Sequence, residues 1–259
     1  MNLSVVIPAH NEAAGLESAV LNFVQTLPSD VAEVLAEIII VENGSNDGTW
    51  DACQRLEKRF PGLVRAVAIP RGSYGEAIKK GMLESRGTHL SILECDFLYA
   101  QFVSASIAIF RQNRAAFVVG SKRHPQSIDR RPLKRRVLTA LFNFIFLRLG
   151  IGYPGTDTHG LKSLETPLAK KLCQLALTTD EVFQSEIVLL AWRLGVKIEE
   201  VPLQIREMRC PPVTVLRRLP KVLNTVQELR RSLARFPKTS FAATEGQTDA
   251  SKVHPAAGP

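Results

Sequence analysis

Three short apolar runs, each followed directly by a polar loop that carries acids, stand out in the pattern of hydrophobic and polar positions. The runs cover residues 3–8, 38–41 and 90–93. Apolar runs of this length, bounded by turn residues, are typical of strands that are buried on both faces of a parallel sheet. Ligands bind at the carboxyl ends of the strands in such a sheet. We therefore expect the three acidic loops to meet at one edge and to form the site.

Predicted helices alternate with the predicted strands through the first half of the chain. This alternation predicts an α/β fold in which helices flank a mostly parallel central sheet. A basic loop at 120–136 follows, and the helix expected at 132–150 is apolar around most of its circumference, so it is buried or contacts lipid. In chain order, the earlier elements we expect are strand 3–8, helix 12–27, strand 37–41, helix 47–60, strand 64–69, helix 75–86, strand 90–94, helix 102–113 and strand 116–119.

The loop after the third run, Glu94-Cys95-Asp96, places two acids one residue apart. In an extended chain the first and third side chains point to the same side, so we expect both carboxylates to face one ligand. Mg²⁺ is typically held by one or two carboxylates together with substrate phosphates. The loop therefore suits a divalent cation and a nucleotide.

Four segments at the predicted strand ends resemble motifs of one family, the nucleotide-sugar-dependent glycosyltransferases of family 2 with the GT-A fold. Residues 8–12 resemble its P-x-[YHF]-N-E opening, 42–49 its D-D-x-S-x-D-x-T loop, 72–77 its Gly- and Ala-containing loop, and 94–96 its D-x-D. Each motif alone is a weak signal, but four in the right order are a strong one. The resemblance implies a Rossmann-like nucleotide-diphospho-sugar transferase fold.

The same resemblance implies the donor site. It assigns the Mg²⁺ or Mn²⁺ cofactor to Asp96 together with Glu94. Several of the implied donor residues have a local alternative, because acids and amides at such positions cap helices and glycines make turns. The residues implied to bind the nucleotide sugar are Pro8, His10, Asn11, Glu12, Glu42, Asp47, Gly72, Gly75, Glu94 and Cys95.

Later segments narrow the resemblance to the dolichyl- and polyprenyl-phosphate sugar transferases. Residues 157–162 are similar to their D-[ST]-x-x-G-[FL]-[KR] segment, and residues 180–186 and 195–202 resemble their F-D-x-E helix and closing E-V-P strand. Glu186 stands at the usual place of a general base. The implied catalytic residues are Asp96, Asp157 and Glu186, and the implied acceptor-phosphate residues are Arg123, Arg135, Thr139 and His159, with Arg131 and Arg136 as alternatives in the basic loop.

Four positions depart from the family pattern. Glu42 and Asn43 stand where the family usually has two Asp, and Glu94 stands where D-x-D has its first Asp. Leu98 replaces a polar metal ligand of some polyprenyl-phosphate mannosyltransferases. Because Glu keeps the charge but moves it one methylene outward, we expect a remodelled site with altered metal coordination.

Length and composition limit the organisation of the chain. Its 259 residues, 45% of them hydrophobic, are enough to bury a substantial core. The four cysteines form no C-x-x-C motif, which is typical of reduced thiols in a cytosolic protein. The longest apolar stretch, 138–147, is shorter than the roughly 20 residues that a spanning helix needs. We expect a catalytic domain at 1–210, a basic amphipathic helical extension at 211–236 and a disordered tail at 237–259.

The net charge of +8 is concentrated in two segments. Residues 122–136 carry seven Lys or Arg against one Asp, and residues 206–235 carry eight against two Glu. Both segments adjoin apolar helical stripes, so one interpretation is contact with an anionic membrane surface. For the second segment the other interpretation is a core helix with a basic outer face. Nucleic acid is the least fitting partner, because no aromatic-rich strand platform accompanies the basic runs.

The acceptor decides the expected mechanism. A sugar hydroxyl must lose a proton and needs a positioned base, whereas a lipid phosphate is already anionic and needs positioning and charge screening. Many arginines beside apolar helices favour the phosphate. We therefore expect an inverting enzyme that moves a hexose from a nucleotide sugar to a polyprenyl-phosphate-type lipid, in the cytoplasm at the membrane surface. The alternatives are a soluble or glycan hydroxyl acceptor, with Glu186 or Asp157 as base, and a catalytically degenerate binding domain.

Overall fold

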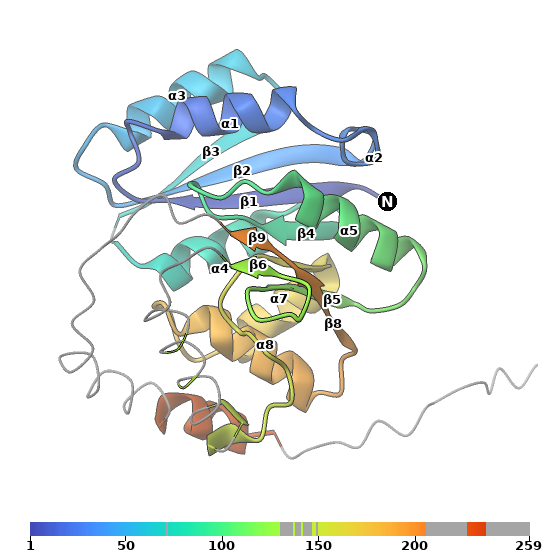
Figure 1. Cartoon of the computed structure of the whole chain (residues 1–259). Helices are drawn as coiled ribbons and strands as arrows, with labels where there is room; N and C mark the ends of the chain where they lie inside the picture. The colour runs from blue at the N-terminus through green and yellow to red at the C-terminus, as the bar shows by residue number, and fades with distance from the viewer. Residues whose placement is uncertain are drawn as a thin grey trace, which may run out of the picture.

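A seven-stranded sheet forms the centre of the protein, and helices cover both of its faces (Figure 1). The structure, a computed structural model, describes residues 1–70, 72–129, 137, 141, 147–148, 150–205 and 227–236. It confirms the predicted α/β class. In chain order the elements are β1 (Leu3–Ala9), α1 (Leu16–Gln25), α2 (Ser29–Ala32), β2 (Leu35–Asn43), α3 (Thr49–Arg59), β3 (Val64–Ile69), α4 (Tyr74–Glu84), β4 (His89–Ile92), α5 (Ala100–Arg111), β5 (Phe117–Ser121), β6 (Ile128–Asp129), β7 (Lys162–Glu165), α7 (Thr166–Leu175), α8 (Phe183–Arg193), β8 (Ile198–Pro202), β9 (Gln204–Ile205) and a helix at 227–234.

The strands of the sheet lie in the order β3-β2-β1-β4-β7-β5-β8. Neighbouring strands are parallel except at β7, which is antiparallel to both β4 and β5. The predicted, mostly parallel sheet is therefore confirmed. The apolar pattern does not predict β7, because its four residues, Lys-Ser-Leu-Glu, form no apolar run. A separate two-stranded sheet pairs β6 with β9.

Alternate residues of the central strands enter two different cores. In β1, Val5 and Ile7 belong to the core that α1, α3 and α5 cover, while Val6 belongs to the core under α4, α7 and α8. All three side chains are fully buried. Burial on both faces explains why such strands appear as continuous apolar runs in the sequence.

Two predicted boundaries differ from the structure at the edge where the site is expected. β2 continues through Glu42 and Asn43, and both residues are buried in the strand rather than placed in a loop. The first helix begins at Leu16 and not at Glu12, because residues 12–15 form a turn in which Gly15 N donates to Glu12 O at 3.0 Å. Glu12 therefore lies before the helix.

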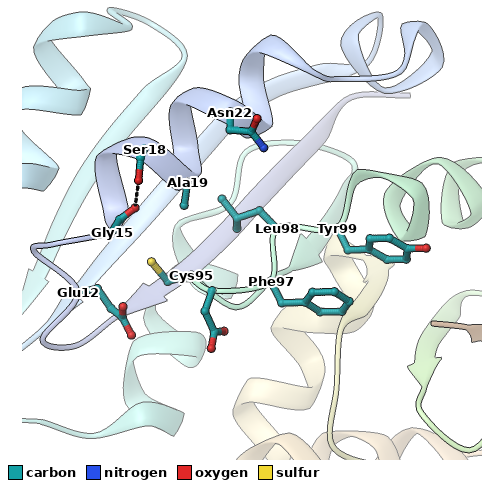
Figure 2. Close-up of a pocket in the computed structure, with 10 residues that line it drawn as sticks. Glu12, Gly15, Ser18, Ala19, Asn22, Cys95, Phe97, Leu98 and Tyr99 are labelled. Carbon is teal, nitrogen blue, oxygen red and sulfur yellow. Dashed lines mark hydrogen bonds between the residues drawn. The ribbon is translucent and has the colours of Figure 1, made fainter. Parts of the chain in front are cut away.

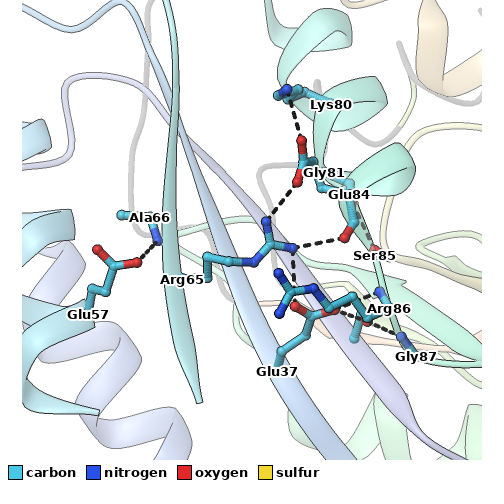
Figure 3. A network of polar contacts seen from close by, with 11 residues as sticks. Glu37, Glu57, Arg65, Ala66, Lys80, Gly81, Glu84, Ser85, Arg86 and Gly87 are labelled. Atoms are coloured by element: carbon cyan, nitrogen blue, oxygen red, sulfur yellow. Dashed lines mark hydrogen bonds and ion pairs between the residues drawn. The ribbon is translucent and has the colours of Figure 1, made fainter. Parts of the chain in front are cut away.

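The amino ends of the strands are held by a polar network around Glu37, a buried residue of β2 (Figure 3). One carboxylate oxygen of Glu37 accepts hydrogen bonds from the Ser4 hydroxyl and from Arg86 N, each at 2.7 Å. The other accepts from Arg65 at 3.2 Å, and Arg65 also donates to the Glu84 carboxylate at 2.8 Å. Because the buried charge has partners, its burial is tolerated. This edge of the sheet is therefore structural and lies opposite the candidate site.

The helix at 227–234 packs against the core under α4, α7 and α8. Its Leu229 and Leu233 side chains are buried members of that core. Arg230 and Arg231 are exposed on its outer side. The described part of the expected amphipathic extension is thus a core helix with a basic outer face.

Several expectations fall outside the described residues. These are most of the apolar helix expected at 132–150, the last residues of the expected catalytic domain (206–210), the earlier part of the extension (211–226) and the expected tail (237–259). Among the helices that the structure does describe, none is both long and apolar enough to cross a membrane.

Candidate active site

The carboxyl ends of β1, β2 and β4 lie side by side at one edge of the sheet. β1 is parallel to both neighbours, with Ala9 opposite Glu42 of β2 and Val6 opposite Ile92 of β4. The loops that follow these strands therefore meet, which confirms the arrangement expected from the apolar runs.

Hydrogen bonds lock the loop after β1 onto the loop after β2. Asn11 has a φ of 54°, a left-handed conformation that Asn adopts more readily than most residues. Its backbone N donates to the Ser45 hydroxyl at 3.0 Å, and its Oδ1 accepts from Asn46 N at 3.1 Å. The side chain of Asn11 therefore holds the two loops together.

Asp47 strengthens the same junction. It accepts from Ala13 N at 3.2 Å, from Thr49 N at 3.1 Å and from the Thr49 hydroxyl at 2.5 Å. The Thr49 hydroxyl bond is the main cause that lowers the pKa of Asp47, and the backbone donors add to it. These are the bonds of a carboxylate that holds the first turn of α3, the local alternative to donor binding.

The residues at the end of β2 shape the edge of the site. The Nδ1 atom of His10 donates to Asn43 O at 2.7 Å, since a carbonyl can only accept. Glu42 accepts from Ser45 N at 2.5 Å, and the side-chain oxygen of Asn43 accepts from Ser73 N at 2.6 Å. The two departures from the family's paired Asp are thus buried positions whose oxygens anchor neighbouring loops.

A cavity of about 760 Å³ opens at this edge, a size typical of small-molecule sites. It joins four of the predicted site residues, His10, Gly72, Glu94 and His159, to side chains from α4, α8 and the turn after β5. The residues that line it are His10, Asn43, Gly72, Ser73, Tyr74, Glu94, Lys122, His159, Asp180, Glu181 and Gln184.

A second cavity, of about 510 Å³, lies between α1 and residues 95–99 (Figure 2). Glu12, Cys95 and Asp96 line it, whereas Glu94 lines the larger cavity. The chain is not extended here, because it turns after β4 and Phe97 N donates to Glu94 O at 2.8 Å. The expectation that an extended chain presents both acids to one side is therefore wrong.

The two acids nevertheless act on one neighbour, the hydroxyl of Tyr74. Burial raises the pKa of Tyr74 well above its ordinary value, and the charges of Glu94 and Asp96 raise it further. Within the described residues, no group of three or more His, Cys, Asp or Glu side chains could hold a metal ion by itself. Two carboxylates near one strand end do fit a Mg²⁺ or Mn²⁺ site that phosphate oxygens complete.

Asp157 is buried behind the larger cavity and is not part of its lining. It accepts from Lys122 N at 3.2 Å and from His159 N at 2.9 Å. Burial raises the pKa of Asp157, although the Lys122 ammonium and these hydrogen bonds act in the opposite direction. Its contacts are those of a residue that positions the backbone of Lys122 and His159.

The predicted acceptor-phosphate residues are brought together only in part. His159 lines the larger cavity, and Arg123 is exposed on the turn after β5. Arg135 and Thr139 lie outside the described residues. Lys122, which the sequence does not single out, lines the cavity and adds a positive charge to it.

Glu186 does not reach the cavity. It is fully buried in α8 and accepts from Leu177 N at 2.9 Å, from Thr178 N at 2.8 Å and from the hydroxyls of Thr178 and Ser232. Four donors occupy the acceptor positions of its two oxygens. The expected role as a general base is therefore wrong for this geometry, and the carboxylate instead joins the loop before α8 to the helix at 227–234.

Pro8 and the two predicted glycines have different surroundings. Pro8 is buried within β1. A Cβ atom on Gly72 would lie 3.5 Å from Asn43 O, which is an ordinary contact. A Cβ atom on Gly75 would lie 2.4 Å from Asp180 O. Gly75 therefore permits α4 to pack on the backbone before α8, and not the approach of a ligand.

We predict that Gly75→Ala lowers the free energy of unfolding by about 1–3 kcal/mol, because backbone must move to admit the methyl group. Urea unfolding followed by circular dichroism measures it. Gly72→Ala is the matched control, since a Cβ atom there makes only an ordinary contact, 3.5 Å from Asn43 O, and we expect it to stay within about 0.5 kcal/mol of the parent. Equal effects of the two substitutions would contradict the assignment.

Besides Lys122, three further residues at the site are not singled out by the sequence analysis. Tyr74 and Gln184 line the larger cavity, and Gln184 Nε2 donates to the Tyr74 hydroxyl at 2.5 Å. Lys162 is fully buried next to them and donates to Gln184 Oε1 at 2.7 Å. Their places within the quoted motifs are the one sequence signal that points to them.

Comparisons with known proteins find relatives among the glycosyltransferases. A dolichyl-phosphate β-glucosyltransferase of Trichomonas vaginalis is 24% identical over 221 residues, which are 80% of this chain and 66% of that protein. The glycosyltransferase AglD of Haloferax volcanii is 25% identical over 204 residues, 78% of this chain and 32% of that protein. The chain thus spans about two thirds of the first relative and one third of the second.

A solved structure has the same fold. It is glucosyl-3-phosphoglycerate synthase from Mycobacterium tuberculosis in complex with Mn²⁺, UDP-glucose and phosphoglyceric acid, with a TM-score of 0.67 and 20% identity, covering 90% of this chain and 80% of that one. The model of the family described as glycosyl transferase family 2 matches residues 4–163. Since this match covers more than half of the chain, the protein belongs to glycosyl transferase family 2.

Proposed function

We propose that this protein is an inverting glycosyltransferase that moves a hexose from a nucleotide sugar to a polyprenyl-phosphate-type lipid. The observation that carries the proposal is the larger cavity, in which the predicted donor residues His10, Gly72 and Glu94 share one space with Lys122 and His159. Family membership and the dolichyl-phosphate relatives support both halves of the reaction.

In the proposed reaction, an oxygen of the lipid phosphate attacks the anomeric carbon of the sugar. The new carbon–oxygen bond forms on the face opposite the departing nucleoside diphosphate, so the configuration inverts. No base is needed, because the attacking oxygen is already ionised. The positive charge of Lys122 screens the repulsion between the two anionic substrates, as electrostatic preorganisation requires.

A divalent cation fits the acidic end of β4. Glu94 and Asp96 would hold it, and the ion would neutralise charge on the diphosphate leaving group. The solved structure with Mn²⁺ and UDP-glucose has the same fold and supports this part of the proposal.

A donor screen tests the proposal. Release of nucleoside diphosphate is measured for a panel of nucleotide sugars with Mg²⁺ or Mn²⁺, with and without a short-chain polyprenyl phosphate. We expect turnover that depends on the lipid phosphate. Turnover with sugars or phosphorylated small acids instead would move the acceptor to the hydroxyl class, and tight nucleotide binding without any turnover would indicate a degenerate binding domain.

We also propose that the basic outer face of the C-terminal segment contacts anionic lipid at the cytoplasmic membrane surface. Arg230 and Arg231 are exposed, while the leucines of the same helix are buried in the core. Electrostatic attraction by exposed cations therefore carries this contact, and the apolar side of the helix is not free to insert.

We predict that Arg230→Glu with Arg231→Glu weakens binding to anionic vesicles by about tenfold or more at low salt, because each cation near the surface contributes about 1 kcal/mol. Vesicle co-sedimentation at two salt concentrations measures it. Lys58→Glu with Arg59→Glu, on exposed positions of α3, is the control with the same change in charge. Parent protein that stays in the supernatant at low salt would remove the membrane proposal.

A further inference from the structure

The centre of the sheet contains a lysine whose burial needs an explanation. Lys162 is 0% exposed and lies on β7, paired with Ile92 of β4 on one side and Val119 of β5 on the other. An ammonium group is among the most costly groups to bury unless it is paired and hydrogen-bonded. A purely apolar side chain would serve a packing role at lower cost.

The partners of Lys162 lead towards the larger cavity. Its Nζ donates to Gly160 O at 2.8 Å and to Gln184 Oε1 at 2.7 Å. Because an ammonium only donates, it fixes the orientation of the Gln184 amide: the oxygen faces Lys162, so the Nε2 group is free to face the other way. That group donates to the Tyr74 hydroxyl at 2.5 Å. Lys162, Gln184 and Tyr74 therefore form a directed chain from the sheet to the cavity lining.

The charges around Lys162 also connect it with the larger cavity. Burial lowers the pKa of Lys162 to about 7, and the carboxylates of Asp157 and Glu94 act against this shift. The charges of Glu94 and Asp96 also raise the pKa of Tyr74, the last residue in this series of hydrogen bonds. Lys162 is thus close enough to Glu94, which lines the larger cavity, for the two charges to act on each other.

We propose that Lys162 is a positioning residue for the donor: its hydrogen bond orients Gln184 and, through Gln184, the Tyr74 hydroxyl at the cavity wall. The substrate class is the nucleotide-sugar diphosphate, and the inference rests on the proposed function for that ligand. Lys162 is fully buried and acts through Gln184, so it does not need to contact the substrate itself.

The first test is structural and independent of turnover. Tyrosine labelled with ¹³C at Cζ gives one NMR signal for each of the three tyrosines, and Tyr74→Phe identifies that of Tyr74. We expect Lys162→Met, which removes the ammonium and keeps an unbranched side chain one atom shorter, to shift the Tyr74 signal, and Lys162→Arg to shift it less. Ser163→Ala is the control, since Ser163 is the adjacent buried polar residue of β7 and its hydroxyl pairs with Ser91 at 2.7 Å, outside the chain.

The second test is kinetic. With the donor found in the screen, we expect Lys162→Met to raise the donor KM by about tenfold or more, with a smaller effect on kcat, and Ser163→Ala to change both by less than about twofold. Gln184→Met removes the relay and should reproduce the Lys162→Met result, which keeps the proposal testable if the lysine variant fails to fold.

The two tests separate the two ideas. An unchanged Tyr74 signal in both Lys162→Met and Gln184→Met would overturn the inference whatever the activity. A shifted signal with no donor turned over by the parent would leave the positioning chain in place and overturn the proposed function. A shifted signal with an unchanged donor KM would show that the chain is structural and would overturn its role towards the donor.

Discussion

Replacing Asp96 by Asn is expected to reduce sugar transfer by about 10²–10³-fold, because it weakens the hold on the divalent cation that would neutralise the leaving diphosphate, and loss of one such electrostatic contribution typically has an effect of this size. Asp96 is exposed in the turn after β4, so its substitution removes little packing. The free energy of unfolding should therefore stay within about 0.5 kcal/mol of the parent. Initial rates of nucleoside diphosphate release, measured across a Mn²⁺ or Mg²⁺ titration, give the effect.

The matched control for this substitution is Glu33→Gln, which also converts an exposed acid to its amide. Glu33 precedes β2 at the opposite edge of the sheet and pairs with Arg111 at 3.7 Å. We expect an unchanged rate for this control. If Asp96→Asn and the parent have the same rate at saturating metal, Asp96 does not hold the ion, and the metal assignment at the end of β4 must be abandoned.

The fold is readable from the sequence where one physical pattern decides the structure. Val5, Val6 and Ile7 are apolar in succession because a central parallel strand is buried on both faces. The acidic loops then meet because strand ends of one parallel sheet share an edge. Neither of these two predictions depends on contacts between residues distant in the sequence. The register of β1 with β2 and β4 confirms both.

Polar residues that are buried by distant partners are not readable in this way. Asn43 is placed in a loop by its polarity, yet it ends β2, where its oxygen accepts from Ser73, thirty residues away. Lys162 lies in a strand without an apolar run, and its partner Gln184 is 22 positions further along the chain. In each case a hydrogen bond to a residue distant in the sequence makes burial of the polar side chain tolerable. The local sequence does not predict that hydrogen bond.

Glu186 is the clearest case, because a motif predicts a catalytic base where the structure has a fully hydrogen-bonded carboxylate. We expect Glu186→Ala to lower the free energy of unfolding by about 3–5 kcal/mol, since it leaves the part-buried donors of Leu177 and Thr178 and the buried hydroxyl of Ser232 without their acceptor. Glu186→Gln should lose less, about 1–3 kcal/mol, because one carboxylate oxygen becomes a donor that faces other donors. Urea unfolding measures both values.

The same variants separate structure from catalysis. A general base that is changed to Gln loses activity without loss of stability, whereas a positioned structural carboxylate loses stability first and keeps its rate per folded molecule. Glu228→Ala, at an exposed position of the helix at 227–234, is the stability control and should stay within about 0.5 kcal/mol of the parent. Because Ser232 lies in the helix at 227–234, we further expect that Ser232→Ala reproduces part of the Glu186→Ala loss. A folded, fully stable Glu186→Gln protein without activity would return Glu186 to the role of base and favour a hydroxyl acceptor over the lipid phosphate.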